Sequence, residues 1–316
     1  MTTTGPLATL FHFSYLLSAI LFIVGLKFLS HPARARQGNL VAAIGMTVAG
    51  LTTLATLWVP GSGYHNQGLI LLAIAIGAVL GTVGARRVAM TDMPQMVALL
   101  NGFGGGSAAL ISTAEFLHAA RAGVSPGATE AFSTMFGCII GAISFSGSMV
   151  AFGKLQGIIS ERAITSAAQK VVNALLFVGL LATIVVIAMG GGAGWFLALL
   201  AGALVFGVLM VIPIGGADMP VVISLLNSFT GLAVAATGFV LQNNALIISG
   251  TLVGASGTIL TQLMCKAMNR SLFNVLFGAF GAVTAPAAGA GGGKGAASAR
   301  PVRDVSIEDA AVLLAN

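Results

Sequence analysis

Long apolar runs follow one another along most of the chain, and short polar stretches separate them. A helix needs about 20 apolar residues to cross the hydrocarbon core of a bilayer. The unbroken apolar character of these runs differs from the strict alternation of apolar and polar residues along the strands of a membrane β-barrel. The pattern therefore predicts an all-α protein, a polytopic membrane helix bundle of nine transmembrane helices, at about 10–30, 39–59, 68–85, 93–117, 130–152, 170–189, 193–213, 219–240 and 244–265.

Composition supports the same class of protein. Of the 316 residues, 57% are hydrophobic and only 7% are charged, whereas soluble domains carry roughly 25% charged residues. The net charge of +6 does not indicate a nucleic-acid partner, because the basic residues are scattered between the apolar runs. Cys138 and Cys265 lie inside apolar runs without metal-ligand spacing, so we interpret them as small core residues and expect no metal site.

The basic residues predict how the helices are oriented. They gather in the stretches that follow the first, third, fifth and ninth runs, and Arg121 alone lies between runs on the opposite side. The positive-inside rule then places the C-terminus in the cytoplasm and residues 1–9 outside it. The basic residues on the predicted cytoplasmic side are Lys27, Arg34, Arg36, Arg86, Arg87, Lys154, Arg162, Lys170, Lys266 and Arg270.

The C-terminal segment differs from the membrane domain predicted at 10–281. Residues 282–303 are rich in Gly and Ala and are typical of a flexible linker. Residues 304–316 begin with a helix-capping pattern, in which Ser306 is followed by Asp309. We expect this segment to be the start of a cytoplasmic domain that the chain does not complete.

One segment occurs twice. "DMPQMVALLNGFGG" (Asp92–Gly105) returns as "DMPVVISLLNSFTG" (Asp218–Gly231), with 8 of 14 positions identical and an offset of 218 − 92 = 126. Asp suits a helix N-cap and Pro suits the first turn, so each copy is predicted to start a helix. Because both starts face the cytoplasm, and "SGSMVAFGK" weakly matches "SGTILTQLMCK", we expect a parallel two-helix internal repeat.

The repeat places an amide in the middle of the membrane twice. Asn101 and Asn227 each lie eight residues after the Met that follows the Asp, about 12 Å along a helix. Either amide can simply join neighbouring helices by a hydrogen bond. Alternatively it can hold water, because small and polar residues share its helix face: Asn101, Gly105, Ala108, Ser112 and Glu115 in one run, and Glu130, Ser133, Gly137, Gly141, Ser144 and Ser148 in the next.

Two carboxylates lie near the predicted outer ends of these helices. Glu115 and Glu130 are candidate functional residues because charged groups in spans are rare, although solvation at the interface explains them equally well. His118 can help a proton to enter or can be a plain interfacial residue. The glycine run Gly104–Gly106 indicates close helix packing or a locally unwound segment, and it is not a phosphate loop because no strand precedes it.

These segments resemble a known family. "GGADMPVVISLLNSFTGLAVAATGF", "GASGTIL", "MCKAMNRS", "MPQMVALLNGFGG" and "SGSMVAFGKL" look like the membrane domain of the beta subunit of proton-translocating NAD(P)+ transhydrogenase. The resemblance implies inward proton translocation coupled to hydride transfer from NADH to NADP+, in a bacterial inner membrane. It implies that NADP(H) binds a C-terminal domain absent from this chain and that NAD(H) binds an alpha-type subunit. It also implies a dimer of alpha–beta units.

The resemblance also implies roles for individual residues. Asn227 matches the Asn on the family's proton path, and Asn101 matches a position that is His in some members. Since an amide does not titrate near neutral pH, Asn101 is expected to hold and orient water. The remaining predicted site residues are Ser148, Glu115 and Glu130 on the proton pathway, and Asp218, Lys266, Arg270 and Asp92 at the cytoplasmic mouth.

Two other classes of protein fit the residue pattern. An autonomous secondary transporter or channel also uses parallel repeats and polar groups at mid-membrane. A passive membrane anchor for nucleotide-binding domains is the third possibility, and the polar helix faces argue against it. The linker at 282–303 and the helix start that follows it favour the transhydrogenase interpretation, because a carrier needs neither.

Overall fold

The structure, a computed structural model, describes residues 6–59, 66–124, 127–164, 166 and 168–277. The chain divides into two compact units, Met1–Gly281 and Ala282–Asn316, and every described residue belongs to the first. The predicted linker at 282–303 and the predicted domain start at 304–316 lie outside the described residues.

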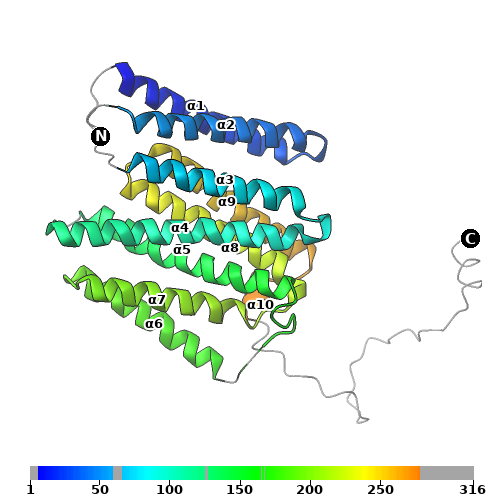
Figure 1. The fold of residues 1–316 in the computed structure, drawn as a ribbon. Coiled ribbons are helices and arrows are strands. Elements are labelled where there is room, and N and C mark those ends of the chain that lie inside the picture. The colour runs from blue at the N-terminus through cyan, green and yellow to red at the C-terminus, as the bar shows by residue number, and fades with distance from the viewer. Residues whose placement is uncertain (1–5, 60–65, 125–126, 165, 167, 278–316) are drawn as a thin grey trace, which may run out of the picture. The chain divides into compact units, whose positions relative to one another are not determined.

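The described residues form helices and no strands, which confirms the all-α prediction (Figure 1). Nine helices in this part of the chain are long and apolar enough to cross a membrane. The α-helices are α1 (Pro6–Leu29), α2 (Ala35–Thr56), α3 (Gln67–Arg87), α4 (Met93–Ala122), α5 (Ala128–Leu155), α6 (Gln169–Ala188), α7 (Ala193–Val211), α8 (Met219–Val240), α9 (Asn244–Ala267) and the short α10 (Leu272–Phe277), and the 3-10 turns are η1 (Pro32–Arg34), η2 (Met90–Asp92) and η3 (Gly216–Asp218).

Each predicted run corresponds to one long helix, and the differences are at the ends. Helix α4 continues to Ala122, beyond the predicted end at residue 117, because the intervening residues include the good helix formers Ala119 and Ala120. Gly123 then ends the helix in the left-handed conformation, with φ 65. The apolar pattern located the helix, and the glycine located its end.

The duplicated Asp residues lie where the sequence predicts, but they do not cap their helices. Asp92 and Asp218 directly precede α4 and α8, and neither side chain accepts a capping hydrogen bond. Each residue ends a 3-10 turn with near-helical backbone angles (φ −97, ψ 2 and φ −93, ψ −3). An N-cap residue needs extended angles to aim its carboxylate at the first N–H groups, so the predicted capping was wrong.

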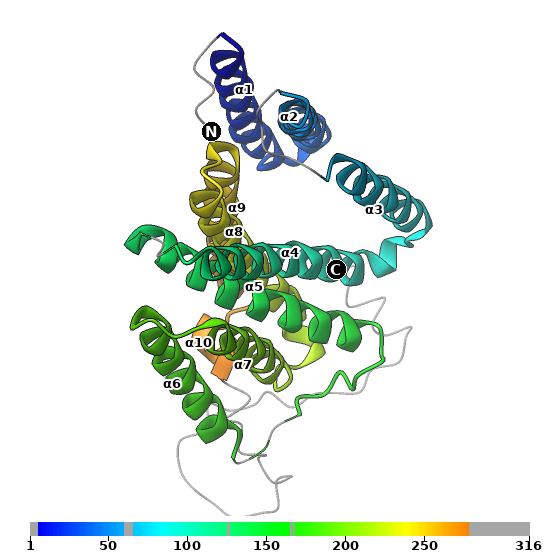
Figure 2. The ribbon, with the colours of Figure 1, turned by 60° about the vertical axis from the view of Figure 1, so that its left-hand side comes forward.

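Helix α5 lies at the centre of the bundle. It packs against α4, α7 and α8, while α9 packs along α8 and joins the α1–α2 pair through α1. Most residues of α5 and α8 are buried. Helix α3, in contrast, has no buried residue and lies at the edge in Figure 2. The predicted functional faces therefore belong to the best-enclosed helices of the described chain.

Glycines allow the central helices to approach closely. A Cβ atom added to Gly141 of α5 would lie 2.6 Å from the carbonyl oxygen of Gly105 of α4. Gly231 of α8 and Gly250 of α9 bring those helices together in the same way, each meeting the other's backbone carbonyl oxygen. Because α4 is helical throughout Gly104–Gly106, the glycine run serves close packing here rather than an unwound segment.

The substitution Gly141→Ala tests this packing. The new methyl group would meet backbone atoms of Gly105 and Ala109, which cannot rotate away, so α4 and α5 must separate. We expect a loss of about 1–3 kcal/mol in the free energy of unfolding, measured by denaturation of the detergent-solubilised protein. Gly179→Ala in α6 is the control, since no atom lies within 4 Å of its added Cβ. Equal stability of the two variants would contradict the close approach.

Candidate functional site

The Asn101 side chain bonds to two hydroxyl groups on the neighbouring helix. Its amide nitrogen Nδ2 donates to Ser148 Oγ at 2.9 Å and to Ser144 Oγ at 3.3 Å. Ser144 and Ser148 are one helical turn apart on α5 and fully buried, and Asn101 is 9% exposed. The polar faces of α4 and α5 thus meet at one depth of the bundle.

Ser144 connects this pair to a third helix. Its Oγ lies 2.6 Å from Thr230 Oγ1 and 2.8 Å from the carbonyl oxygen of Leu226, both on α8. The Thr230 hydroxyl also lies 3.5 Å from the carbonyl oxygen of Asn101. We call Asn101, Ser144, Ser148 and Thr230 the polar cluster. Each hydroxyl has a single hydrogen, so Ser144 and Thr230 can each direct it to either of two acceptors.

Two buried oxygen atoms on the same face of α4 have no hydrogen-bond partner among the described residues. They are Asn101 Oδ1 and Ser112 Oγ, and Ser112 is 1% exposed. An unpaired buried polar atom costs about 1–3 kcal/mol. The polar face of α4 therefore offers free acceptors at two depths, about 17 Å apart for 11 residues along the helix.

Asn227 does not join the polar cluster. It is half-buried, and the described residues provide no hydrogen bond for its side chain. Its neighbour Leu226 faces α5, while Ser228 donates to the carbonyl oxygen of Gly254 on α9 at 2.7 Å. Because successive residues of a helix point about 100° apart, Asn227 lies between these two contacts. The sequence repeat thus places two equivalent amides in unequal surroundings.

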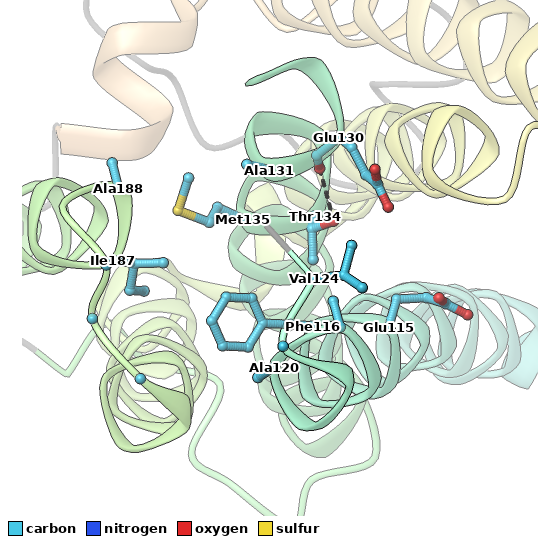
Figure 3. Close-up of a pocket in the computed structure, with 15 residues that line it drawn as sticks. Glu115, Phe116, Ala120, Val124, Glu130, Ala131, Thr134, Met135, Ile187 and Ala188 are labelled. Carbon is cyan, nitrogen blue, oxygen red and sulfur yellow. Dashed lines mark hydrogen bonds between the residues drawn. The ribbon is translucent and has the colours of Figure 1, made fainter. Parts of the chain in front are cut away.

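A pocket of about 460 Å³ lies at the end of the bundle where α4 ends and α5 begins. Glu115 and Glu130 both line it, and Figure 3 shows their carboxyl groups on the side away from Phe116 and Met135. Thr134 Oγ1 donates to the backbone carbonyl oxygen of Glu130 at 2.8 Å. Glu130 is exposed and Glu115 is half-buried. His118 is also exposed at this end.

The opposite end of the bundle carries an ion pair. Arg270 Nη1 lies 2.7 Å from Asp218 Oδ2 and 2.8 Å from Oδ1. The Asp218 side chain is 15% exposed and that of Arg270 is 53% exposed. Lys266 is exposed in the last turn of α9, and Asp92 accepts a long hydrogen bond of 3.4 Å from Thr91. Asp218 and Arg270 are therefore brought together, whereas the described residues show no ion pair for Asp92 or Lys266.

Three buried or hydrogen-bonded polar residues of the bundle were not among the predicted site residues. Ser144 was placed on the polar face of its helix, and its spacing of four from Ser148 was the available signal. Thr230 gave no signal, because the first copy of the repeat has Gly104 at the equivalent position (230 − 126 = 104). Lys154 was counted only among the basic residues outside the membrane, yet it is fully buried.

The glycine run Gly104–Gly106 does not form a dinucleotide-binding loop. Phosphate-binding glycine loops present free backbone N–H groups at the start of a helix. Gly104–Gly106 instead lie within α4, where those N–H groups bond inside the helix. The same part of the chain brings together no group of three or more His, Cys, Asp or Glu side chains that could hold a metal.

Comparison with known proteins identifies the family. A family model described as NAD(P) transhydrogenase beta subunit matches residues 11–316. The chain belongs to this family. It is 45% identical over 307 residues to NAD(P) transhydrogenase subunit beta of Rhodospirillum rubrum, and the same values hold for a second sequence of that name from a defined strain of the species. The match covers 96% of this chain and 64% of each relative, so the chain spans less than two thirds of their length.

Family membership and the nine apolar helices together make this chain a multi-pass membrane protein of the transhydrogenase beta family. The beta-family match also agrees with the resemblance that the duplicated segments indicate. Asn101, Ser148, Asp218 and Arg270 all lie within the matched region. The match assigns no role to any of these residues, so their roles remain predictions.

The contribution of the Asp218–Arg270 ion pair to stability can be tested. Arg270 is half-exposed, so water and salt screen its attraction to Asp218. We expect Arg270→Gln to change the free energy of unfolding by less than about 1 kcal/mol, measured by thermal denaturation in detergent. Asp218→Asn should behave alike, since it removes the same pair. A loss of several kcal/mol in either variant would contradict the assignment of a weak, screened pair.

Proposed function

We propose that this chain is the proton-conducting membrane domain of a transhydrogenase, and that it couples inward proton translocation to hydride transfer from NADH to NADP+. The observation that supports this most directly is the polar cluster, which joins α4, α5 and α8 inside the bundle. It occurs in a chain of the transhydrogenase beta family.

The polar cluster has the chemistry that a proton relay needs. A proton crosses a hydrocarbon layer only along groups that both accept and donate hydrogen bonds. The hydroxyls of Ser144 and Thr230 do both, and each has two acceptors within reach. Asn101 cannot titrate, but its unpaired Oδ1 can hold a water molecule against the hydroxyls. We therefore assign Asn101 the role of orienting water rather than carrying the charge.

The proposed route runs along α4 and α5. Protons enter at the pocket that Glu115 and Glu130 line, with His118 nearby. They pass the unpaired hydroxyl of Ser112 on the way to the polar cluster. Asn227, three residues before Thr230, is proposed to hold water on the inner side of the cluster. The route ends near Asp218 and Arg270.

The topology is part of the proposal. Nine transmembrane helices with the N-terminus outside would put the Asp218 end in the cytoplasm of a bacterium. A parallel two-helix repeat, α4–α5 and α8–α9, is supported by the turns before α4 and α8. Ala89 and Gly215, which precede η2 and η3, have the same backbone angles, φ −73 and ψ 156.

Cofactors and partners follow from the family. NADP(H) is proposed to bind a domain that follows the membrane domain, and NAD(H) an alpha-type subunit, in a dimer of alpha–beta units. The nucleotide domain would dock at Asp218, Arg270, Lys266 and Asp92, on the end of the bundle away from the pocket. Coupling then requires that the docked domain bind two conformations of the membrane domain with different affinity. An autonomous transporter has less support, because the chain belongs to the beta family.

The substitution Asn101→Leu tests the relay. In the complete transhydrogenase complex it removes both hydrogen bonds to α5 and the free oxygen. Interactions of about 1–3 kcal/mol correspond to roughly fivefold to 150-fold in rate, so we expect a loss of at least about fivefold in proton uptake by vesicles. Asn173→Leu in α6 is the control, since that amide bonds only to the Leu209 carbonyl outside the cluster. Near-normal uptake by Asn101→Leu would remove it from the route.

Water access gives an independent test. Ser148→Cys should react with a small water-soluble thiol reagent, because the Ser148 side chain accepts a hydrogen bond from the Asn101 amide, whose oxygen is free to hold water. Ser146→Cys is the control, since Ser146 is also buried on α5 but faces Gly207 of α7. We expect at least about tenfold faster labelling at 148, measured by mass spectrometry. Equal rates at the two positions would show that no water reaches the cluster.

A further inference from the structure

Lys154, in the last turn of α5, is a charged side chain enclosed by protein. It has no exposed surface, and its ammonium group donates to three backbone carbonyl oxygens. These belong to Ile212 at 2.6 Å, Ile214 at 2.7 Å and Arg162 at 3.2 Å. No carboxylate among the described residues pairs with it.

This arrangement is specific rather than incidental. A lysine at the end of a membrane helix ordinarily extends its charge into water, as the exposed Lys266 can at the end of α9. Burying an ammonium group is unfavourable unless every N–H finds an acceptor. Lys154 has three N–H bonds and three carbonyls. The Ile212 carbonyl also lies at the negative end of α7.

The three carbonyls belong to two segments that connect helices at this end of the bundle. Arg162 is in the loop at 156–164, and Ile212 and Ile214 are in the turn between α7 and η3. A second contact joins the same two segments, because Gly216 N donates to the carbonyl oxygen of Glu161 at 2.8 Å. The turn continues directly into Asp218, so Lys154 and Glu161 fix the backbone that presents it.

The same helix carries two residues of the polar cluster. Ser148 lies six residues before Lys154, about 9 Å along α5. A displacement of the turn before Asp218 can therefore reach Ser144 and Ser148 through the rigid helix α5, provided that Lys154 links the turn to this helix. Without this link, the turn connects to α5 only by packing and by the Gly216–Glu161 hydrogen bond to the loop that follows α5.

We propose that Lys154 is a positioning residue, and that its three hydrogen bonds couple the Asp218 turn to the polar cluster on α5. The inference rests on the proposed function, because coupling has meaning only if the chain translocates protons. Lys154 itself does not carry the proton: its ammonium group has no acceptor site, and all three donors are engaged.

The test uses the complete transhydrogenase complex in membrane vesicles. Lys154→Met keeps an unbranched side chain, one atom shorter than that of lysine, and removes all three donors. We expect the number of protons taken up per hydride transferred to fall by about fivefold, in the range of couplings that connecting residues carry, while hydride transfer in uncoupled vesicles changes less. Lys27→Met, at an exposed lysine in the last turn of α1, is the control and should keep the ratio.

A disulfide can replace the lost link. A Cβ atom on Gly216 would lie 3.3 Å from Glu161 Cβ, close to the Cβ separation in disulfides. Glu161→Cys with Gly216→Cys should therefore cross-link on oxidation. In the Lys154→Met background we expect oxidation to restore the number of protons taken up per hydride transferred, and reduction to lower it again. With Lys154 present, oxidation should leave the ratio unchanged, since the contact is already closed. The single-cysteine variants control for other thiol chemistry.

The outcomes separate the two proposals. If the unsubstituted complex takes up no protons during hydride transfer, the proposed function fails. If it does take up protons, two results overturn the positioning role. One is that Lys154→Met keeps the normal number of protons per hydride, and the other is that the disulfide does not restore that number. Should Lys154→Met fail to assemble, Lys154→Gln, which keeps two N–H donors, replaces it. If neither assembles without the disulfide, Lys154 serves folding alone and the proposal is wrong.

Discussion

A polar group in the middle of a membrane bundle must find its hydrogen-bond partner within the protein or in water that the protein holds. In this chain Ser144 meets that requirement for three helices at once, since it contacts Asn101 on α4 and both Thr230 and Leu226 on α8. The contact is possible only because Gly105 and Gly141 let α4 and α5 approach to backbone distance. Close packing and the polar cluster are therefore one feature, and the proposed proton relay depends on both.

The two ends of the central helices differ in a way that suits directional transport. At one end Glu115 and Glu130 border an open pocket. At the other end, Asp218 is held by Arg270 on one side and by the Lys154-linked turn on the other. An open, acidic end can collect protons, whereas a constrained end can respond to a docked domain. If Lys154 transmits that response, the coupling element is the rigid helix α5 and no long-range rearrangement of the bundle is needed.

Sequence reasoning located parts of the candidate site well and others poorly. The spacing of Asn101, Gly105, Ala108 and Ser112 predicted a common face, and all four are buried in α4. The repeat, however, made Asn227 the equivalent of Asn101, and the structure gives it no comparable partner. Equivalent positions in a sequence repeat need not have equivalent neighbours, because α8 packs closely against both α5 and α9, whereas α4 packs mainly against α5 and less extensively against α8. The predicted Asp caps failed because the preceding 3-10 turns set the backbone angles.

The sequence by itself determined that this is an all-helical membrane protein, roughly where its long helices begin and end, and which faces of α4 and α5 are small and polar. These follow from composition and from the 3.6-residue period, which are local properties of the chain. Only the tertiary structure decided that Ser144 and Thr230 complete the polar cluster, that Asp218 pairs with Arg270, and that Lys154 is buried rather than facing water. Each of those contacts joins residues on different helices or loops. Which helix lies beside which is set by the packing of the whole bundle, and no local pattern records it.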